Sequence, residues 1–487
     1  MTFKFNYETS KGIKQVILTN CGQAPFKRFS ILGNSHQDST TGKQLFDVSA
    51  LKNISGFSVD EDGFIMQKVY NTTSPKTLKE LIPSIEAGKS YYLSVDNPDD
   101  FTGFFGFTGS VSAWYKNQTF VPKEDDLNIR PGIVSKVGGN ARYRLMITEG
   151  QTASPYEPYT GGKPSPSHDY PQQIKNVGKW NEEKQKYEVD VRVTGKNLFD
   201  KDSVQLNVEF GDANSDFISM KDGWFVSDFI PVFSGKTYFI SGKKTGYGYK
   251  LYDIDKHFIK NIQLTHGRLS VEDGINYVRI NGEMKDLKNI QVELGTTATS
   301  YEPYYKEQTA TITMDEPLRG IGKYQDKITK DGIVRWIKEI VLDDSSGWTT
   351  DNSNQNVGII NRFLHRINDM RNVYYEKVTV CDKFRWIGMP ASESEAGSYR
   401  HTTHGTKFYI CLLKKDYPDV ESLKQFLSKN PVTVQYALHN PVTEPLTQEQ
   451  KSALESLCTF PGTTVITVDG GDVDAGIEVE YATKNKE

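Results

Sequence analysis

Three groups of aromatic side chains have neighbours of the kind that bind sugars. Trp114 and Tyr115 precede a lysine, an asparagine and a glutamine, and Tyr247 and Tyr249 lie in a glycine-rich segment. Trp348 follows two aspartates. A flat ring can pack against the apolar face of a pyranose while polar neighbours hydrogen-bond its hydroxyls. We expect these five residues to be exposed and to bind carbohydrate, with packing in the core or at its rim as the alternative for each.

Residues for catalysis do not form a recognisable set. The sequence has no Gly-x-Ser-x-Gly elbow, no phosphate-binding loop and no dinucleotide-binding fingerprint. Residues 33–36 (Gly-Asn-Ser-His) resemble the opening block of a lipase-like hydrolase family, but the Asp-x-x-His pair of such an enzyme is absent downstream. A loop between strands accounts for them better. We therefore expect no catalytic residues and no enzyme. A glycan hydrolase is the alternative, because the separation of two carboxylates cannot be read from one sequence.

Possible metal ligands have simpler explanations. His401 and His404 are three residues apart, a spacing that on a helix could place two imidazoles on one ion, but their Thr and Gly neighbours favour a turn. Acidic residues gather at 60–62 and at 469–474, yet their spacing matches no defined calcium loop and hairpin turns account for it. We expect no metal site and no cofactor.

The elements that must position these side chains are arranged as a repeat. An opening motif at residues 42–47 (Gly-Lys-Gln-Leu-Phe-Asp) recurs at 195–200 (Gly-Lys-Asn-Leu-Phe-Asp). A closing motif, Tyr-Glu-Pro-Tyr, stands at 156–159 and again at 301–304. Between them, Ile-Pro, a Gly-Lys-Ser/Thr-Tyr strand and a Gly-x-Thr-Ala run recur in the same order. One domain is therefore used twice, and insertions in its loops change the offset between the copies.

Bulk composition narrows the class. A chain of 487 residues suits about three domains of roughly 150 residues each. It has 58 basic and 62 acidic side chains and a formal net charge of −4, so no strong field attracts nucleic acid or an anionic membrane. No run approaches the roughly 18 apolar residues of a membrane span, and the N-terminal residues lack the pattern of a cleaved signal peptide. The four cysteines have no paired spacing, which predicts reduced, mostly buried thiols.

Alternation of apolar and polar residues predicts strands through most of the chain. Residues 187–193 place tyrosine and valines on one face and charged residues on the other, and residues 477–481 have the same period of two. Helical signals occur only in the last third, at 423–427 and after a capping box of Thr447 and Gln450. The expected fold class is all-β, built of antiparallel sandwiches, with one or two short helices near the C-terminus.

Four segments follow from the repeat and from its linker. Residues 1–21 precede the first repeat and hold few apolar side chains, so we expect an N-terminal attachment arm there. Residues 22–160 are assigned to the first β-sandwich repeat and residues 161–306 to the second, which begins with a glycine- and proline-containing linker at 161–174. Residues 307–487, where the repeat can no longer be followed, are expected to be a separate C-terminal β-rich module.

A family resemblance rests on the opening and closing motifs, on residues 159–172, which run from Tyr-Thr-Gly-Gly-Lys-Pro to Tyr-Pro-Gln, and on three C-terminal motifs. The latter are Ile-Val-Arg-Trp at 333–336, Val-Leu-Asp at 341–343 and Gln-Tyr-Ala-Leu at 435–438. Over most of its length the chain thereby resembles tail and baseplate proteins of phages and prophages that infect Gram-positive bacteria. The resemblance implies tandem jelly-roll-like sandwiches of the carbohydrate-binding-module type. The same motifs recur in baseplate, fibre and minor structural proteins, so they identify the group and leave the role of one member open.

The resemblance implies a bacteriophage tail or baseplate structural protein that contributes to attachment at the host cell surface. Its location would be the virion, at the tail tip or baseplate, after assembly in the host cytoplasm. Expected partners are other tail and baseplate proteins, host cell-wall saccharide and copies of the chain itself, with a trimer favoured, and neither nucleic acid nor a membrane. We expect the two shared motifs to be structural and the loops to bind. The alternatives are a structural spacer that holds a separate receptor-binding protein and, less favoured, a tail-associated glycan hydrolase.

Overall fold

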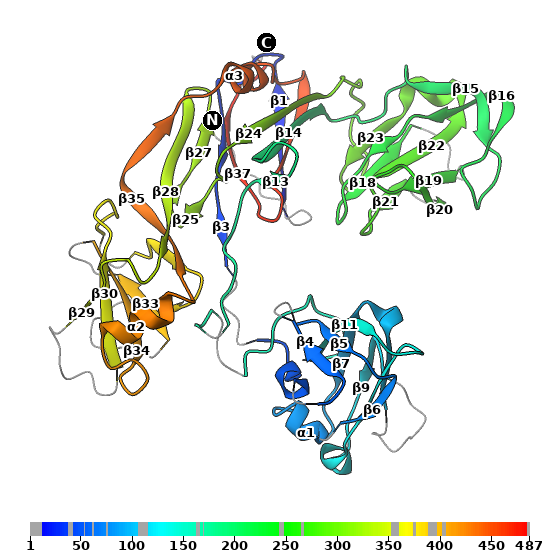
Figure 1. Ribbon diagram of the computed structural model, residues 1–487. Coiled ribbons are helices and arrows are strands. Elements are labelled where there is room, and N and C mark those ends of the chain that lie inside the picture. Colours follow the sequence, from blue (N-terminus) through cyan, green and yellow to red (C-terminus); the bar gives the residue numbers. More distant parts are fainter. Residues whose placement is uncertain are drawn as a thin grey trace.

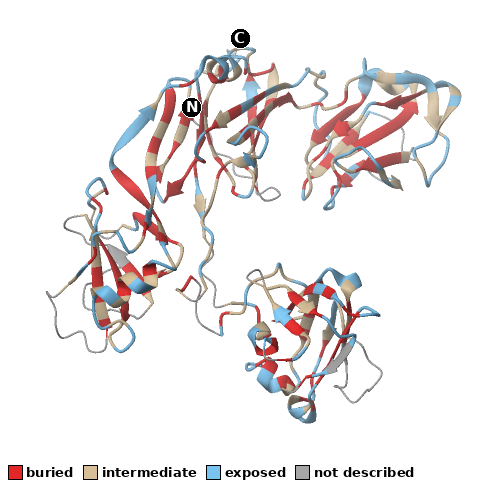
Figure 2. Cartoon of the chain, in the orientation of Figure 1, coloured by how far each residue is buried: buried red, intermediate tan, exposed pale blue. Residues whose placement is uncertain are grey.

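The structure is a computed structural model that describes residues 12–37, 42–52, 54–60, 63–74, 76–105, 115–161, 166–168, 170–242, 248–263, 267–351, 360–373, 376–387, 397–401 and 406–484. Within these ranges most regular elements are strands and the helices are short, so the fold is all-β as the alternating patterns predict. Figure 1 shows a central body, two separate sandwiches and a C-terminal lobe. Buried residues run along the strands of each part (Figure 2).

The body is a sandwich of two sheets built from separate stretches of the chain. One sheet has the order β1-β36-β14-β13, with β24 also paired to β14, and the other has the order β31-β35-β28-β27-β2-β37. Apolar side chains from both sheets form one core, which α3 covers at one end. The strands and the helix are β1 (Ile13–Cys21), β2 (Arg28–Leu32), β13 (Lys179–Asn181), β14 (Lys186–Gly195), β24 (Gln308–Met314), β25 (Gly320–Ile321), β26 (Tyr324–Gln325), β27 (Lys327–Thr329), β28 (Gly332–Leu342), β31 (Thr379–Cys381), β35 (Val432–Glu444), α3 (Gln448–Glu455), β36 (Gly462–Asp469) and β37 (Gly476–Glu480).

Period-two alternation and helix caps act in the body as the sequence predicts. In β14, Val189, Val191 and Val193 are at most 1% exposed, whereas the charged residues between them face outward. Helix α3 begins after Thr447, whose side chain accepts the N–H of Gln450 while the Gln450 side chain accepts the N–H of Thr447. These local signals are correct because each depends only on residues a few positions apart.

The expected N-terminal arm at residues 1–21 is wrong for the described part of that segment. β1 pairs with β36 in the body, and Val16, Leu18 and Cys21 are 5%, 2% and 0% exposed. β1 is the edge strand of its sheet, and distant strands supply the rest of the core. The few apolar residues of one face are therefore enough to hold β1 in the body. Residues 22–37 also belong to the body, through β2.

The C-terminal module at 307–487 is likewise not a separate unit. Its strands β24 and β36 flank β14, which precedes the second repeat, and β27 and β37 flank β2. The long strands β28 and β35 continue out of the body into the C-terminal lobe (Figure 1). That lobe has its own core, and its elements are β29 (Thr349–Thr350), β30 (Ile360–Arg366), β32 (Arg385–Trp386), β33 (Ser398–His401), β34 (Lys407–Leu413) and α2 (Val420–Leu427).

The first repeat is a sandwich inserted into the body between β3 and β12. Its sheets have the orders β4-β5-β11-β7-β9 and β6-β10-β8 around a single core. Its elements are η1 (Val48–Leu51), β4 (Phe57–Val59), β5 (Ile65–Gln67), β6 (Asn71–Thr73), α1 (Leu78–Leu81), β7 (Tyr91–Asp96), η2 (Pro98–Asp100), β8 (Phe101–Phe105), β9 (Gln118–Phe120), η3 (Glu124–Asn128), β10 (Gly132–Ser135) and β11 (Ala141–Glu149). The chain leaves the body after β3 (Ser35–His36) and returns through β12 (Lys175–Asn176), and these two strands pair with each other. Residues 162–165 and 169 of the expected linker lie outside the described residues.

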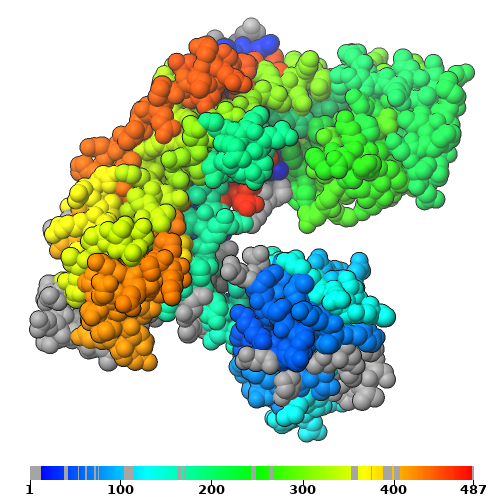
Figure 3. Space-filling model, in the orientation of Figure 1, coloured from blue at the N-terminus to red at the C-terminus, as the bar shows by residue number. Residues whose placement is uncertain are grey.

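The second repeat is inserted between β14 and β24. Its sheets have the orders β15-β16-β22-β19-β20, with β17 also paired to β22, and β21-β18-β23. Its elements are β15 (Val204–Phe210), β16 (Ile218–Ser227), β17 (Ile230–Pro231), β18 (Thr237–Ser241), β19 (Gly248–Tyr252), β20 (Phe258–Gln263), β21 (Arg268–Ser270), β22 (Tyr277–Glu283), η4 (Met284–Asn289) and β23 (Gln291–Leu294). Figure 3 shows the two repeats as separate masses, the first in blue and cyan and the second in green.

The two repeats share the pairing of their landmark strands. In the first repeat Leu93 of β7 lies opposite Ile147 of β11, and in the second Ile240 of β18 lies opposite Val292 of β23. These four positions correspond in the sequence repeat, so the register is the same. A third strand also pairs with the landmark strand in each copy, β9 in one and β21 in the other.

Candidate functional site

The opening motif holds each sandwich together through one buried amide side chain. The Asn197 amide donates to the carbonyl of Ile290 at 3.1 Å, and its oxygen accepts the N–H groups of Phe199 and Val292 at 3.0 Å. In the first repeat the Gln44 amide makes the equivalent three bonds, to the carbonyl of Leu145 and the N–H groups of Phe46 and Ile147. The amide ties the first segment of each sandwich to its last strand. This part of the motif is structural, as its sequence suggests.

The closing motif has different partners in the two copies. Glu302 forms an ion pair with Lys196 at 3.0 Å. It also accepts two hydrogen bonds from Thr463 of β36, both at 3.0 Å. It therefore fastens the second repeat to the body. Glu157 of the first repeat instead accepts the N–H of Lys43, within its own opening motif, at 2.9 Å.

Docking of the second repeat onto the body forms a cleft with a volume of about 420 Å³. We call it the inter-domain cleft. One wall is the outward face of β14 and the segment that follows the repeat, and the other wall comes from the repeat, from residues 198–203, 227–231, 256 and 277. The lining residues are Arg192, Thr194, Leu198, Phe199, Asp200, Ser203, Ser227, Asp228, Phe229, Ile230, Pro231, Lys256, Tyr277, Tyr304 and Glu307.

An aromatic cluster covers one wall of the inter-domain cleft. Phe229 and Tyr277 are half-buried, and their rings meet edge to face with centroids 5.9 Å apart. Tyr252 buttresses Phe229 from the core side at 4.8 Å. The exposed ammonium of Lys256 lies 5.0 Å from the Phe229 centroid and 5.6 Å from that of Tyr277. The aromatic surface of the cleft therefore attracts a cation, the ammonium of Lys256.

Carboxylates and a phenol form the polar part of the inter-domain cleft. Glu307 accepts a hydrogen bond from Arg192 Nε at 2.5 Å, and Asp200 accepts the N–H of Asp202 and the hydroxyl of Ser203 at 2.9 Å. Tyr304 is half-buried, and burial together with the nearby charges of Asp200 and Glu307 raises its pKa. Its hydroxyl therefore stays protonated at neutral pH. The cleft therefore combines carboxylates that accept hydrogen bonds, a phenol that can donate one, and the faces of aromatic rings.

Three of the expected carbohydrate-binding residues are described, and two of them are buried. Tyr249 is 3% exposed in the core of the second repeat, where burial raises its pKa to about 12. Trp348 is 4% exposed in the C-terminal lobe, and its indole N–H donates to the carbonyl of Asp343 at 3.1 Å. The expectation that these rings are exposed is wrong, because each belongs to a core that the sequence does not reveal. Trp114 and Tyr247 lie outside the described residues.

Tyr115 is the remaining sequence candidate. It is half-buried and packs edge to face on Phe120, with ring centroids 5.7 Å apart, against the core of the first repeat. Of the other expected residues, the two that the structure describes lie in other cores, Tyr249 in the second repeat and Trp348 in the C-terminal lobe. The aromatic residues that do line a cleft, Phe229, Tyr277 and Tyr304, were missed. Position beside a repeat landmark could have signalled two of them, since Phe229 precedes the Ile-Pro pair and Tyr304 ends the closing motif.

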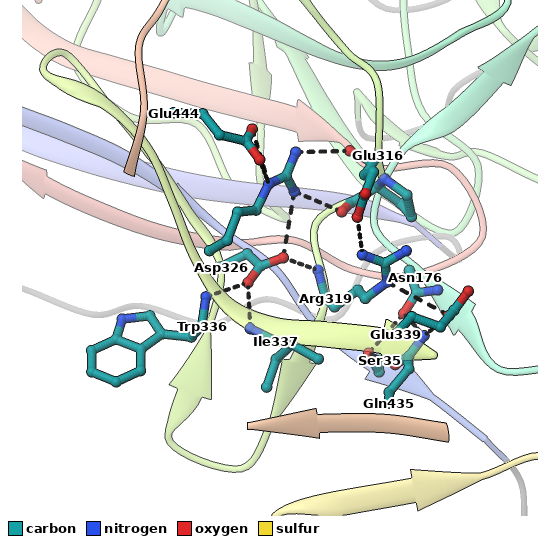
Figure 4. Close-up of polar contacts among 12 residues, drawn as sticks. Ser35, Asn176, Glu316, Arg319, Asp326, Trp336, Ile337, Glu339, Gln435 and Glu444 are labelled. Atoms are coloured by element: carbon teal, nitrogen blue, oxygen red, sulfur yellow. Dashed lines mark hydrogen bonds and ion pairs between the residues drawn. The ribbon is translucent and has the colours of Figure 1, made fainter. Parts of the chain in front are cut away.

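The suggested hydrolase segment has a structural role. Ser35 Oγ lies 2.7 Å from Asn176 Oδ1 and 2.8 Å from Gln435 Oε1, and it accepts the N–H of Gly320 at 3.1 Å. These amide neighbours do not provide the base that a nucleophilic serine needs. Gln435 belongs to the Gln-Tyr-Ala-Leu motif, and it also donates to Glu339 at 2.8 Å, as Figure 4 shows.

The Ile-Val-Arg-Trp motif surrounds a buried carboxylate beside this contact. Asp326 is fully buried, and its two oxygens accept the N–H groups of Trp336, Ile337 and Arg319 at 2.7, 2.9 and 3.0 Å (Figure 4). The pairing of β28 with β35 shifts register at these residues, between 335 and 337. Asp326 thus satisfies the backbone donors that this β-bulge frees. The motif is explained by the architecture of the body.

One group of described residues has the geometry of metal ligands. The side-chain ligand atoms of Asp253, Asp255 and His257 lie within 4.8 Å of one another in the turn between β19 and β20. Asp253 also accepts the N–H groups of Asp255 and His257, at 3.0 and 2.8 Å, as in an ordinary Asx turn. Of the acidic residues at 469–474, Asp469 pairs with Lys179 and Asp472 with Lys175. His404 and the His401 side chain lie outside the description.

Comparison with known proteins gives no family. No protein-family model, no curated protein and no solved structure matches the chain. None of the helices in the described ranges is both long and apolar enough to cross a membrane.

Proposed function

We propose that the protein is a bacteriophage tail or baseplate component that contributes to host attachment by binding cell-surface saccharide in the inter-domain cleft. The observation that carries this proposal is the combination of Phe229, Tyr277 and Tyr304 with the carboxylates of Asp200 and Glu307 in a space of about 420 Å³. That volume is within the range of small-ligand sites, about 300–1,000 Å³. The motif resemblance supplies the tail or baseplate setting.

Sugar recognition explains why these residue types stand together. The C–H face of a pyranose stacks on a ring, and its hydroxyls donate to carboxylates and accept from a phenol. The exposed Lys256 ammonium that rests on the rings is replaced by the sugar, which leaves it free to bind a hydroxyl at the rim. Weak single sites are sufficient because copies on one virion act together, and a trimeric assembly would present three clefts.

The test compares Tyr277→Ala with a matched control, Tyr301→Ala. Tyr301 is 48% exposed in the closing motif and does not line the inter-domain cleft. Loss of the Tyr277 ring is expected to weaken single-site binding by about 0.5–1.5 kcal/mol. The assay is retention of the full chain on purified cell walls from a panel of Gram-positive species, with melting temperature recorded for each variant.

The outcomes separate the three candidate roles. Retention that Tyr277→Ala reduces and Tyr301→Ala leaves intact favours attachment through the cleft. Release of reducing ends from the walls would instead indicate a glycan hydrolase. Wild-type protein that is neither retained nor releases sugar would refute the proposal in favour of the structural spacer, a role that the Glu302 contact to the body would suit.

A further inference from the structure

An indole ring lies exposed at a second groove, on the body. Trp180 of β13 is 43% exposed, and it meets Tyr187 of β14 edge to face with centroids 5.0 Å apart. The two residues are direct cross-strand partners, so both rings are on the same side of the sheet. Tyr187 packs against the body core, whereas Trp180 continues the apolar face past the edge of that core. Its free surface borders a groove with a volume of about 380 Å³.

Three segments far apart in the sequence form this groove, which we call the Trp180 groove. β12 and β13 supply Lys175 and Trp180, Pro317 follows β24, and Asp472 comes from the turn between β36 and β37. Gly178 lies on its floor, where an added Cβ would stand 3.3 Å from Tyr187. Because the φ of Gly178 is +131°, this point of the groove favours glycine, and the shape of the groove is set by the body fold.

The charges at the rim of the Trp180 groove are compensated. Lys175 pairs with Asp472 at 2.9 Å. Lys179 is held between Asp190 and Asp469, at 3.0 Å from the latter. Although burial lowers the pKa of Lys179, its bonds to the two aspartates raise it, so the lysine remains charged and paired. An anionic ligand would have to break these pairs, and a cationic ligand would meet lysines.

We propose that the Trp180 groove is a second saccharide site, for a neutral pyranoside. A neutral sugar can stack its C–H face on the indole while its hydroxyls donate to Asp472 and accept from Lys175. This ligand needs no uncompensated charge, which an anionic sugar or a phosphate would need. The site is independent of the inter-domain cleft and goes beyond it.

The two sites lie at opposite ends and on opposite faces of β14. Tyr187 faces the core side of the sheet near one end of the strand, and Arg192 faces outward near the other. Five residues of extended chain separate them by about 17 Å. A ligand in one site does not touch the residues of the other, so each can be removed separately.

The test is titration of the full chain with neutral methyl pyranosides and short neutral wall oligosaccharides, followed by saturation-transfer NMR. Trp180→Ala is expected to weaken binding about three- to tenfold, and Trp180→Phe, which keeps a ring, should lose less. Tyr70→Ala is the matched control, since Tyr70 is an aromatic residue 45% exposed on the first repeat. Tyr277→Ala removes only what binds in the cleft and should leave the part of the binding that depends on Trp180 unchanged, which distinguishes the groove from the cleft.

Two results would overturn the proposal. One is a failure in the binding assay: either Trp180→Ala protein keeps its melting temperature and binds the sugars as the wild type does, or the wild type binds none of them at millimolar concentration. The other is a change of oligomeric state in light scattering of Trp180→Ala, which would show that the indole is covered by a second copy of the chain.

Discussion

The buried amide of the opening motif can be tested by a single-atom exchange, Asn197→Asp. The side chain is 1% exposed, and its NH₂ group donates to the carbonyls of Ile290 and Glu302, at 3.1 and 3.2 Å. A carboxylate has no donor, so it would place negative charge against two carbonyl oxygens. The folded variant can avoid this by protonating the new carboxyl, which restores one donor.

Protonation sets the expected cost. An aspartate has an ordinary pKa of about 3.9, and holding it neutral at pH 7 costs about 1.36 kcal/mol for each of roughly three pKa units, or about 4 kcal/mol. The missing second donor adds about 1 kcal/mol. The second repeat should therefore lose about 5 kcal/mol at pH 7. The pKa of the new carboxyl is raised in the folded state, so the loss shrinks to about 1 kcal/mol as pH falls to about 4.

Hydrogen exchange of residues 197–304, read by mass spectrometry, isolates the second repeat from the rest of the chain. The control is Asn214→Asp, which adds the same charge at an exposed turn of the same repeat. The reasoning is refuted if Asn197→Asp loses no more protection than this control at pH 7. It is also refuted if the loss is the same at pH 4 and pH 7.

Three further predictions test other parts of the structure. Trp348→Ala should behave as a core truncation, lowering the stability of the C-terminal lobe by about 3–5 kcal/mol in a calorimetric scan, whereas a sugar-binding Trp348 would change binding and leave melting intact. Glu316→Gln should destabilise the body at pH 7, because the hydrogen bond from Arg319 stabilises the charged Glu316 side chain and lowers its pKa. The wild type loses this stabilisation as pH falls below about 4, where the carboxylate is protonated. A difference in melting temperature between variant and wild type that is the same at all pH values would contradict this. Deletion of residues 1–21 should lower the free energy of unfolding by roughly 4–8 kcal/mol, because the apolar contacts of the buried face of β1 are lost. A truncated chain with an unchanged urea midpoint would instead support an attachment arm at residues 1–21.

Much of the fold follows from short-range patterns in the sequence. The two opening motifs identify two copies of one sandwich, and the structure gives these copies the same register at Leu93 and Ile240. Alternation predicts β14, and the Thr447 capping box predicts α3. Each of these depends on local spacing, which a sequence displays directly.

The body could not be predicted, because its contacts join distant stretches of chain. Gln15 of β1 donates to Thr467 of β36 across more than 450 positions. The sequence of neither segment predicts that the two strands pair. The same limit explains the failure with Tyr249 and Trp348. A Trp or Tyr beside polar residues is typical both of a binding loop and of a strand end, and only the distant strands that cover the ring decide between them.

The closing motif shows how one sequence element acquires two roles. Glu157 and Glu302 hold the same place in the repeat, but only Glu302 reaches Thr463 of the body. Docking through Glu302 brings β14 against the second repeat, and the inter-domain cleft needs both surfaces, because Arg192 comes from one and Phe229 from the other. The first repeat returns instead to the body through β3 and β12. A duplicated sandwich can therefore gain a cleft through where it is attached, with no change in its shared motifs.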